Sequence, residues 1–333
     1  MTTNPQFNNV LERKCMEIPE ELKIAIQEQS EGLHVKNVVE NSQIISERYR
    51  KNDGKGKNLL NKKEEAISYM ISRMPATYCA IYTAIQKTME NYEGKLNTSI
   101  DIGAGTGSAT WALNEIINLE QSTCLEREDV MLELGKQLMT NSSVKATWKK
   151  FDVLKDELQE NADIVITSYM INELPENERK QVIEKIWNIT NKVLIIIEPG
   201  TPNGFKNILT ARNLLIEKGA NILAPCVHKG KCEIKEDDWC GFSARVARSG
   251  LHRLAKKGEL SYEDEKFSYI AFSKDDTNIK GERILRHPQI GKGFIKIKTC
   301  SQKGIEEKVI TKKQGEIYKK LKKQNAGDLI NND

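Results

Sequence analysis

A glycine-rich stretch from Thr98 to Leu113 holds the first residues whose types and spacing could do chemistry. It reads Thr-Ser-Ile-Asp-Ile-Gly-Ala-Gly-Thr-Gly-Ser-Ala-Thr-Trp-Ala-Leu, so a short apolar run leads into three glycines and then into a helical pattern. This order predicts a strand, a tight turn and a helix N-terminus. Glycines let a backbone approach a ligand closely, and the unpaired N–H groups at a helix start can bind it. The stretch therefore predicts a cofactor loop, although a glycine turn without a ligand has the same pattern.

Two classes of cofactor use such a loop. A nicotinamide dinucleotide site has the motif Gly-x-Gly-x-x-Gly, whose third glycine would fall on Ser108 here. The spacing of Gly103, Gly105 and Gly107, with Asp101 two residues before the first glycine, instead resembles the S-adenosylmethionine loop of class I methyltransferases. The spacing favours S-adenosylmethionine.

Polar residues also follow the next predicted strands. Ligands of open α/β sheets bind beyond the carboxyl ends of the strands, so Glu126 could accept the ribose hydroxyls and Asp152 the adenine amino group. Either acid alone is more often an ordinary loop residue, and it is their occurrence together at strand ends after a glycine loop that favours the cofactor site. Asn172 and Glu173 are the candidate catalytic residues, and a polar helix cap is their alternative role. The predicted cofactor-binding residues are Asp101, Gly103, Gly105, Thr106, Gly107, Glu126, Asp152 and Ser168.

Four cysteines form a second candidate site. Cys226, Cys232 and Cys240 lie in one short segment, and Cys300 stands apart in the C-terminal part. Four thiolates suit either a [4Fe–4S] cluster or a structural Zn²⁺. The absence of a Cys-x-x-Cys pair slightly favours iron–sulfur, whereas His228 in place of one thiol would favour zinc. Unliganded thiols are the third possibility.

The elements that must position these residues alternate between strand and helix, which predicts an α/β fold with a mostly parallel sheet covered by helices on both faces. Three further helices are expected before it, with a polar loop at 51–58. We expect a helical N-terminal region at 1–90, a cofactor-binding domain at 91–275 with a cysteine-bearing insertion at 221–255, and a small basic segment at 276–333. The predicted strands are 100–102, 122–126, 146–151, 162–168, 192–198, 267–272, 293–299 and 306–311, and the predicted helices are 19–50, 64–74, 76–89, 110–118, 129–139, 177–187 and 207–217.

Charge is unevenly distributed along the 333 residues. Residues 280–333 hold 14 Lys and Arg against 6 Asp and Glu, whereas the rest of the chain has a net charge of −4. A basic segment predicts a polyanionic partner such as RNA, or simply a solvated lysine-rich tail. With 38% hydrophobic residues, no apolar run of about 18 residues and no targeting pattern, we expect a cytoplasmic protein whose cysteines are reduced.

Linked motifs across roughly residues 66–305 resemble the methyltransferase-like assembly proteins of the small ribosomal subunit, whose best-known members are mitochondrial. The motifs include Arg73-Met-Pro-Ala-Thr-Tyr78, Asp101-Ile-Gly-Ala-Gly-Thr-Gly107, Asn172-Glu-Leu174, Glu198-Pro-Gly-Thr-Pro202, Asp238-Trp-Cys240 and Arg283-Ile-Leu-Arg-His-Pro288. The resemblance implies a class I methyltransferase fold, S-adenosylmethionine, and a [4Fe–4S] cluster on Cys226, Cys232, Cys240 and Cys300. It also implies association with the small subunit through rRNA. Without a presequence, a monomeric bacterial member is expected.

Three functions remain open at this stage. The first is an rRNA methyltransferase, the second a non-catalytic assembly factor that binds rRNA, and the third a small-molecule methyltransferase. After the fourth predicted strand the chain reads Ser168-Tyr-Met-Ile-Asn-Glu173, without the proline pair of amino-directed base methyltransferases or a catalytic cysteine. A methyl donor is already activated, so positioning alone can supply much of the catalysis. The basic segment and the resemblance disfavour the small-molecule enzyme.

Overall fold

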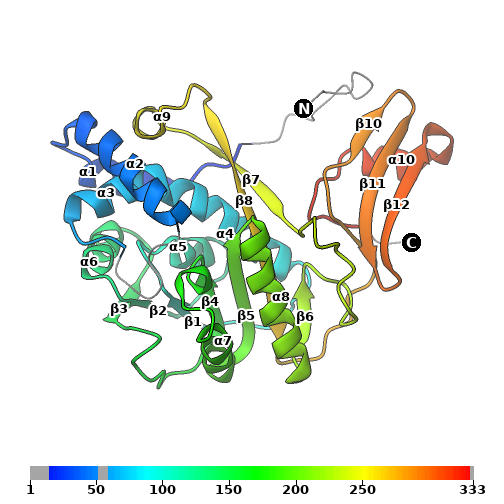
Figure 1. Ribbon diagram of the computed structural model, residues 1–333, viewed down its shortest axis with the longest axis horizontal. Helices are drawn as coiled ribbons and strands as arrows, with labels where there is room; N and C mark the ends of the chain where they lie inside the picture. The colour runs from blue at the N-terminus through cyan, green and yellow to red at the C-terminus, as the bar shows by residue number, and fades with distance from the viewer. Residues whose placement is uncertain (1–14, 52–58, 331–333) are drawn as a thin grey trace.

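An eight-stranded sheet forms the centre of the molecule in a computed structural model, which describes residues 15–51 and 59–330 (Figure 1). Its strands are β1 (Thr98–Ile102), β2 (Gln121–Glu126), β3 (Ala146–Lys150), β4 (Ala162–Ser168), β5 (Thr190–Pro199), β6 (Asn221–Ala224), β7 (Phe242–Ala247) and β8 (Tyr262–Ser273). Their order is β3-β2-β1-β4-β5-β8-β6, and β7 pairs with β8. The pairs among the first five strands are parallel, whereas β8 is antiparallel to β5, β6 and β7.

Helices cover both faces of this sheet. The helices of the domain are α4 (Met74–Met89), α5 (Ser108–Ile116), α6 (Asp129–Met139), the 3₁₀ turn η1 (Ile171–Glu173), α7 (Arg179–Asn188) and α8 (Pro202–Glu217). Ile164 and Ile166 of β4 pack with α4, α5 and α6, whereas Val165 between them packs with α7 and α8. Because both faces are buried, the central strands are continuous apolar runs, as is typical of parallel sheets.

The N-terminal helices lie on the α6 side of the sheet (Figure 1). They are α1 (Glu20–Gln29), α2 (Val35–Lys51) and α3 (Lys63–Ser72). The single helix predicted at 19–50 is wrong, because the chain turns between α1 and α2, where Gly32 has a φ of 75°. The predicted interruption at Pro75 also lies elsewhere: α3 ends before Arg73, and Pro75 sits in the first turn of α4, where proline costs no hydrogen bond. The predicted loop falls outside the described residues at 52–58.

The C-terminal segment forms a separate five-stranded antiparallel sheet, drawn in orange and red in Figure 1. Its strands are β9 (Glu282–Ile284), β10 (Gln289–Gly291), β11 (Phe294–Ser301), β12 (Gly304–Thr311) and β13 (Leu329–Ile330). The 3₁₀ turn η2 (Lys312–Gln314) and the helix α10 (Gly315–Leu321) lie between β12 and β13 in the chain. Tyr318 and Leu321 of α10 close a small core with Ile284, Ile295 and Ile297. β11 and β12 lie where the sequence predicts short strands.

The segment at 221–255, expected as an insertion, contributes to the main sheet. It supplies β6 and β7 and the short helix α9 (Gly250–Lys256). Between β6 and β7 the chain runs without regular structure, and this stretch carries the three clustered cysteines. No helix in the ranges 15–51 and 59–330 is both long and apolar enough to cross a membrane.

Candidate functional site

The glycine loop joins β1 to α5 in a conformation that requires its glycines. Gly103, Gly105 and Gly107 have φ values of 70°, 57° and 86°, which side chains rarely adopt. A Cβ on Gly103 would lie 2.7 Å from Cγ of Met170, so the close approach also excludes a side chain there. The loop therefore turns tightly enough to bring main-chain amides to the end of β1.

Glu126, at the end of β2, holds this loop in place. Its Oε2 accepts a hydrogen bond from the amide of Gly105 at 2.7 Å, and its Oε1 accepts one from the amide of Glu128, also at 2.7 Å. Burial raises the pKa of Glu126, and the two amides oppose this by stabilising the charged carboxylate. The carboxylate therefore sits at a fixed point beside the loop.

One pocket lies between the glycine loop and the ends of β2 and β4. The predicted site residues that line it are Gly103, Gly105, Glu126, Asp152, Ser168 and Glu173. Residues as far apart as 103 and 173 in the sequence thus meet because parallel strands end at the same edge of the sheet. This edge is the ordinary ligand site of open α/β sheets.

Four other predicted residues lie outside the lining of this pocket. Asp101 is completely buried, and its Oδ2 accepts a hydrogen bond from Oγ1 of Thr110 at 3.1 Å. Burial raises the pKa of Asp101 to about 7. Thr106 is buried, and Gly107 caps α5. Asn172 lies in η1, and its carbonyl accepts a long hydrogen bond of 3.4 Å from Arg179.

Carboxylates dominate the electrostatics of the pocket. Burial raises the pKa of Glu173 to about 8, and repulsion by Glu128 and Glu126 adds to the effect. Burial likewise raises the pKa of Glu128 to about 7, and only Arg127 in this lining opposes the shifts with a positive charge. Protonation is the cheapest response of crowded, buried carboxylates. A ligand with positive charge would relieve the repulsion, whereas phosphate groups would increase it.

Sequence reasoning missed several lining residues. Glu128 follows Glu126 by two positions, and its carboxylate also accepts hydrogen bonds from the amides of Leu59 and Leu60, which fasten the N-terminal region beside the pocket. Tyr169 was not missed, because it lies in the stretch from Ser168 to Asn172 that is expected to line the reactive side, and it lines the pocket. It has a φ of 61°, which is rare for a residue with a side chain. Its position after the strand was the available signal. Its conformation was not visible in the sequence.

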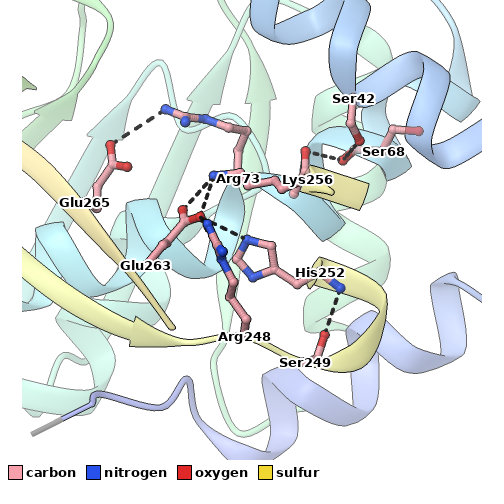
Figure 2. A network of polar contacts seen from close by, with 10 residues as sticks. Ser42, Ser68, Arg73, Arg248, Ser249, His252, Lys256, Glu263 and Glu265 are labelled. Atoms are coloured by element: carbon pink, nitrogen blue, oxygen red, sulfur yellow. Dashed lines mark hydrogen bonds and ion pairs between the residues drawn. The ribbon is translucent and has the colours of Figure 1, made fainter. Parts of the chain in front are cut away.

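Glu263 and Glu265 of β8 form a network of ion pairs (Figure 2), and Tyr169 bonds to one of these two carboxylates. Oη of Tyr169 donates a hydrogen bond of 3.2 Å to Glu265 of β8, and Arg73, between α3 and α4, lies 3.6 Å from the same carboxylate oxygen. Two residues earlier, Glu263 contacts Arg248 and Lys256, each at 2.6 Å. The long strand β8 therefore ties the pocket to the N-terminal helices and to α9.

The four candidate metal ligands converge on a different cavity. Cys226, Cys232, Cys240 and Cys300 all line it, with His228 beside them. Sγ of Cys300 lies 3.5 Å from Nε2 of His228. β11 thus brings a cysteine from the C-terminal sheet to the three cysteines between β6 and β7.

Four thiols that share one cavity suit two kinds of metal centre. Four thiolates around one zinc ion lie about 3.8 Å apart, as follows from a Zn–S distance of about 2.3 Å in a tetrahedron. Within residues 15–51 and 59–330, no group of three His, Cys, Asp or Glu side chains is arranged to hold a metal ion. In a [4Fe–4S] cluster each cysteine binds its own iron, so the sulfur atoms lie further apart. The four cysteines in one cavity are therefore compatible with either centre.

The sheet order, the reversed strand β8 between β5 and β6, and the glycine loop followed by an acid at the end of β2 define a class I methyltransferase fold, as predicted. The chain belongs to the Rsm22 family, because residues 63–331 match the family described as "Mitochondrial small ribosomal subunit Rsm22". The family resemblance found in the sequence is thereby confirmed.

Two curated relatives are longer than the stretch that this chain matches. The human "Ribosome assembly protein METTL17, mitochondrial" is 24% identical over 294 residues, which cover 80% of this chain and 62% of the human protein. The "Rsm22-cox11 tandem protein 2, mitochondrial" of Schizosaccharomyces pombe is 22% identical over 326 residues, covering 80% of this chain and 43% of the yeast protein. The chain thus spans less than two thirds of either relative.

Two methyltransferases are among the solved structures that are similar to this chain. A putative RNA methyltransferase from Pyrococcus horikoshii covers 59% of this chain and is covered to 82%, with 17% identity and a TM-score of 0.40. Magnesium protoporphyrin IX methyltransferase from Synechocystis, with bound SAM, covers 74% of this chain and is covered to 99%, with 12% identity and a TM-score of 0.39.

Proposed function

We propose that the protein binds S-adenosylmethionine in the pocket at the glycine loop and acts on or with the rRNA of the small ribosomal subunit. Family membership supports the ribosomal part, and the human relative is named a ribosome assembly protein. The observation that carries the cofactor is the acidic pocket, in which Glu126 is fixed against Gly105.

The charges in the pocket favour S-adenosylmethionine over a dinucleotide. The sulfonium and ammonium groups of S-adenosylmethionine are cations, which the carboxylates of Glu126, Glu128 and Glu173 would attract. The pyrophosphate of a dinucleotide would instead face four acids, because Asp152 also lines the pocket, and a single arginine. In our assignment, Glu126 accepts the ribose hydroxyls and Asp152 the adenine amino group, while the glycine loop gives the amino-acid end room.

Glu173 is the better of the two candidate catalytic residues. It lines the pocket, and its pKa of about 8 lets it hold or accept a proton near neutral pH. Asn172 is not part of the lining and instead bonds Arg179 through its carbonyl. The alternative is an assembly factor that binds the cofactor without methyl transfer.

Two measurements test this proposal. Titration calorimetry with S-adenosylmethionine and with S-adenosylhomocysteine should show binding of both, and an absence of binding contradicts the cofactor assignment. Incubation with methyl-labelled S-adenosylmethionine and small-subunit precursor particles should then label rRNA, and Glu173→Gln should reduce labelling while binding persists. Binding without any labelling favours the non-catalytic factor.

We further propose that Cys226, Cys232, Cys240 and Cys300 hold a [4Fe–4S] cluster, with zinc as the alternative. The support is that all four cysteines line one cavity and that the family resemblance implies a cluster on them. Such a centre would join the cysteine segment to β11, so loading would be part of folding. Iron, sulfide and zinc analysis of protein purified without oxygen, with a visible spectrum, decides between them. About four irons and four sulfides per chain support the cluster, whereas about one zinc per chain contradicts it.

The C-terminal unit is the proposed contact for the rRNA backbone. Six exposed lysines surround α10 against one glutamate, Glu316: Lys312, Lys313, Lys319, Lys320, Lys322 and Lys323. Phosphates attract such a cluster irrespective of base sequence. The unit is folded around its own small core, so the lysines are presented on a defined surface.

A further inference from the structure

Two buried arginines lie next to the residues that line the cysteine cavity. Arg212 on α8 is 2% exposed, and Arg283 on β9 is not exposed at all. Both rank among the largest fully buried side chains of the described protein. A buried guanidinium stays protonated, so each position carries a full positive charge inside the fold.

The hydrogen bonds of these arginines go to neutral groups: main-chain carbonyls and, for Arg212, also the side-chain oxygen of Asn213 at 3.3 Å. Arg212 donates to the carbonyls of His228 and Gly230, at 2.9 and 2.6 Å. Arg283 donates to the carbonyls of Pro225 and Gly327, at 3.0 and 2.8 Å. One nitrogen of each guanidinium, Nε of Arg212 and Nη2 of Arg283, is buried without a hydrogen-bond partner. Carbonyls orient a cation, but they do not neutralise it.

Neither arginine pairs with a carboxylate. Among the ion pairs within the described ranges, neither Arg212 nor Arg283 has an Asp or Glu oxygen within 4.0 Å. Buried charges in proteins are almost always paired, because removing a charge from water without a counter-charge is costly. Glu233 also lines the cysteine cavity, but its carboxylate accepts a hydrogen bond from the amide of Ile305 and forms no ion pair with either arginine. The two positive charges therefore lack a paired carboxylate.

The cysteine cavity is where negative charges for these arginines belong. Arg212 lines the cavity with the four cysteines, and its carbonyl partners lie in the cysteine-bearing segment. Arg283 pairs directly across the C-terminal sheet with Cys300, and paired residues of antiparallel strands point to the same face.

We propose that Arg212 and Arg283 are the counter-ions of an anionic metal–thiolate centre held by the four cysteines. The inference rests on the metal site proposed above. Four thiolates exceed the charge of one zinc ion, or of an oxidised [4Fe–4S] core, by about two negative charges. The two guanidiniums balance this excess. The stripped protein instead retains two uncompensated cations, so the arginines make loading favourable.

Charge-conserving and charge-removing substitutions of Arg212 test the role of the charge. Arg212→Lys keeps the positive charge. Arg212→Gln keeps a hydrogen-bond donor but removes the positive charge. Each variant is loaded without oxygen using ferrous iron and sulfide, and in parallel using Zn²⁺ alone. The readouts are the rate of metal loss to a chelator and the rise in Tm between stripped and loaded protein. We expect Arg212→Gln to lose metal at least about tenfold faster than wild type and to show a smaller rise in Tm, with Arg212→Lys close to wild type.

The controls separate this inference from the metal site itself. Cys226→Ser should lose the metal, and if it retains the metal as wild type does, the proposed metal site is wrong. If Cys226→Ser loses metal while Arg212→Gln matches wild type, only the counter-ion role is wrong. Equally fast metal loss in Arg212→Lys and Arg212→Gln also overturns the counter-ion role, because the hydrogen-bond geometry of the arginine, and not its charge, would then determine metal retention. Arg283→Lys and Arg283→Gln repeat the comparison at the second arginine. Without metal, a glutamine variant removes an uncompensated buried charge and should therefore fold. If neither Arg212→Gln nor Arg283→Gln folds, the counter-ion proposal is overturned.

Discussion

The carboxylate of Glu126 accepts a hydrogen bond from the main-chain amide of Gly105 at 2.7 Å, so the end of β2 fixes the glycine loop after β1. Its second oxygen accepts from the amide of Glu128. Both oxygens therefore face N–H donors. The position of the proposed ribose acceptor and the shape of the loop are set by the same side chain.

Glu126→Gln should weaken binding of S-adenosylmethionine by about 10–100-fold. A glutamine must direct its own amide N–H₂ at one of the two main-chain donors, which loses a charge-assisted hydrogen bond worth about 1.5–3 kcal/mol. Titration calorimetry measures the effect. Glu133→Gln, on the exposed side of α6, is the matched control and should bind like wild type. An unchanged Kd for Glu126→Gln would show that this carboxylate does not face the cofactor.

Affinity for S-adenosylmethionine should rise with pH between about 6 and 9. The pKa values of Glu128 and Glu173, about 7 and about 8, lie above the ordinary value of a free glutamate. In the free protein, the stability these groups contribute is therefore present at low pH and is lost as pH rises through 7–8. A cation favours the ionised forms, so binding releases protons, and Kd falls by at most about tenfold per pH unit for each proton released.

The control for this pH dependence is S-adenosylhomocysteine, which lacks the sulfonium charge. Its Kd should change less over the same range, and calorimetry in buffers of different ionisation enthalpy should count fewer protons released. If both ligands respond equally to pH, the carboxylates are not responding to the charge of the cofactor.

Strands and helices whose residue pattern is complete within the element itself could be predicted well from the sequence. The strand at 162–168 and the helix at 129–139 have the predicted bounds, because an apolar run and a helical repeat are complete within their own residues. β6 was missed because its four residues, next to a Pro-Cys pair, show no alternation of their own. The cofactor edge could be predicted because glycine spacing and strand ends locate it.

Contacts between distant residues could not be predicted from the same patterns. Tyr169 and Glu265 are 96 positions apart, and neither has a motif that marks the other. The hydrogen bonds of Glu128 to Leu59 and Leu60 cross a similar distance along the chain. The buried Arg212 and Arg283 resemble ordinary charged residues until the structure shows their burial. Such contacts depend on how elements pack, which the local pattern does not contain.

Glu263→Gln should lower the free energy of unfolding by about 3–5 kcal/mol, because it leaves Arg248 and Lys256 without their counter-charge. Burial raises the pKa of Glu263, but hydrogen bonds from His252 and Lys256 and the charge of Lys256 outweigh burial and hold this pKa below its usual range. The stabilisation is therefore present above pH about 4.5 and is lost as pH falls. Urea unfolding at pH 7 measures the change. Glu160→Gln, in an exposed ion pair with Lys149, should cost less than about 1 kcal/mol, and equal effects would show that the buried network has no special weight.

Replacing four of the exposed lysines near α10 by glutamine should weaken RNA binding and flatten its salt dependence. Each lost phosphate contact with single-stranded RNA reduces the slope of log K against log salt by about 0.7, so the slope should fall by up to about 3. Filter binding of small-subunit rRNA between low and moderate salt measures both quantities. The variant carries Lys319→Gln, Lys320→Gln, Lys322→Gln and Lys323→Gln, and its control removes the same charge from the methyltransferase domain with Lys136→Gln, Lys149→Gln, Lys155→Gln and Lys180→Gln. If the control loses as much affinity, net charge and not the C-terminal unit determines binding, whereas a loss confined to the first variant locates the RNA contact at α10.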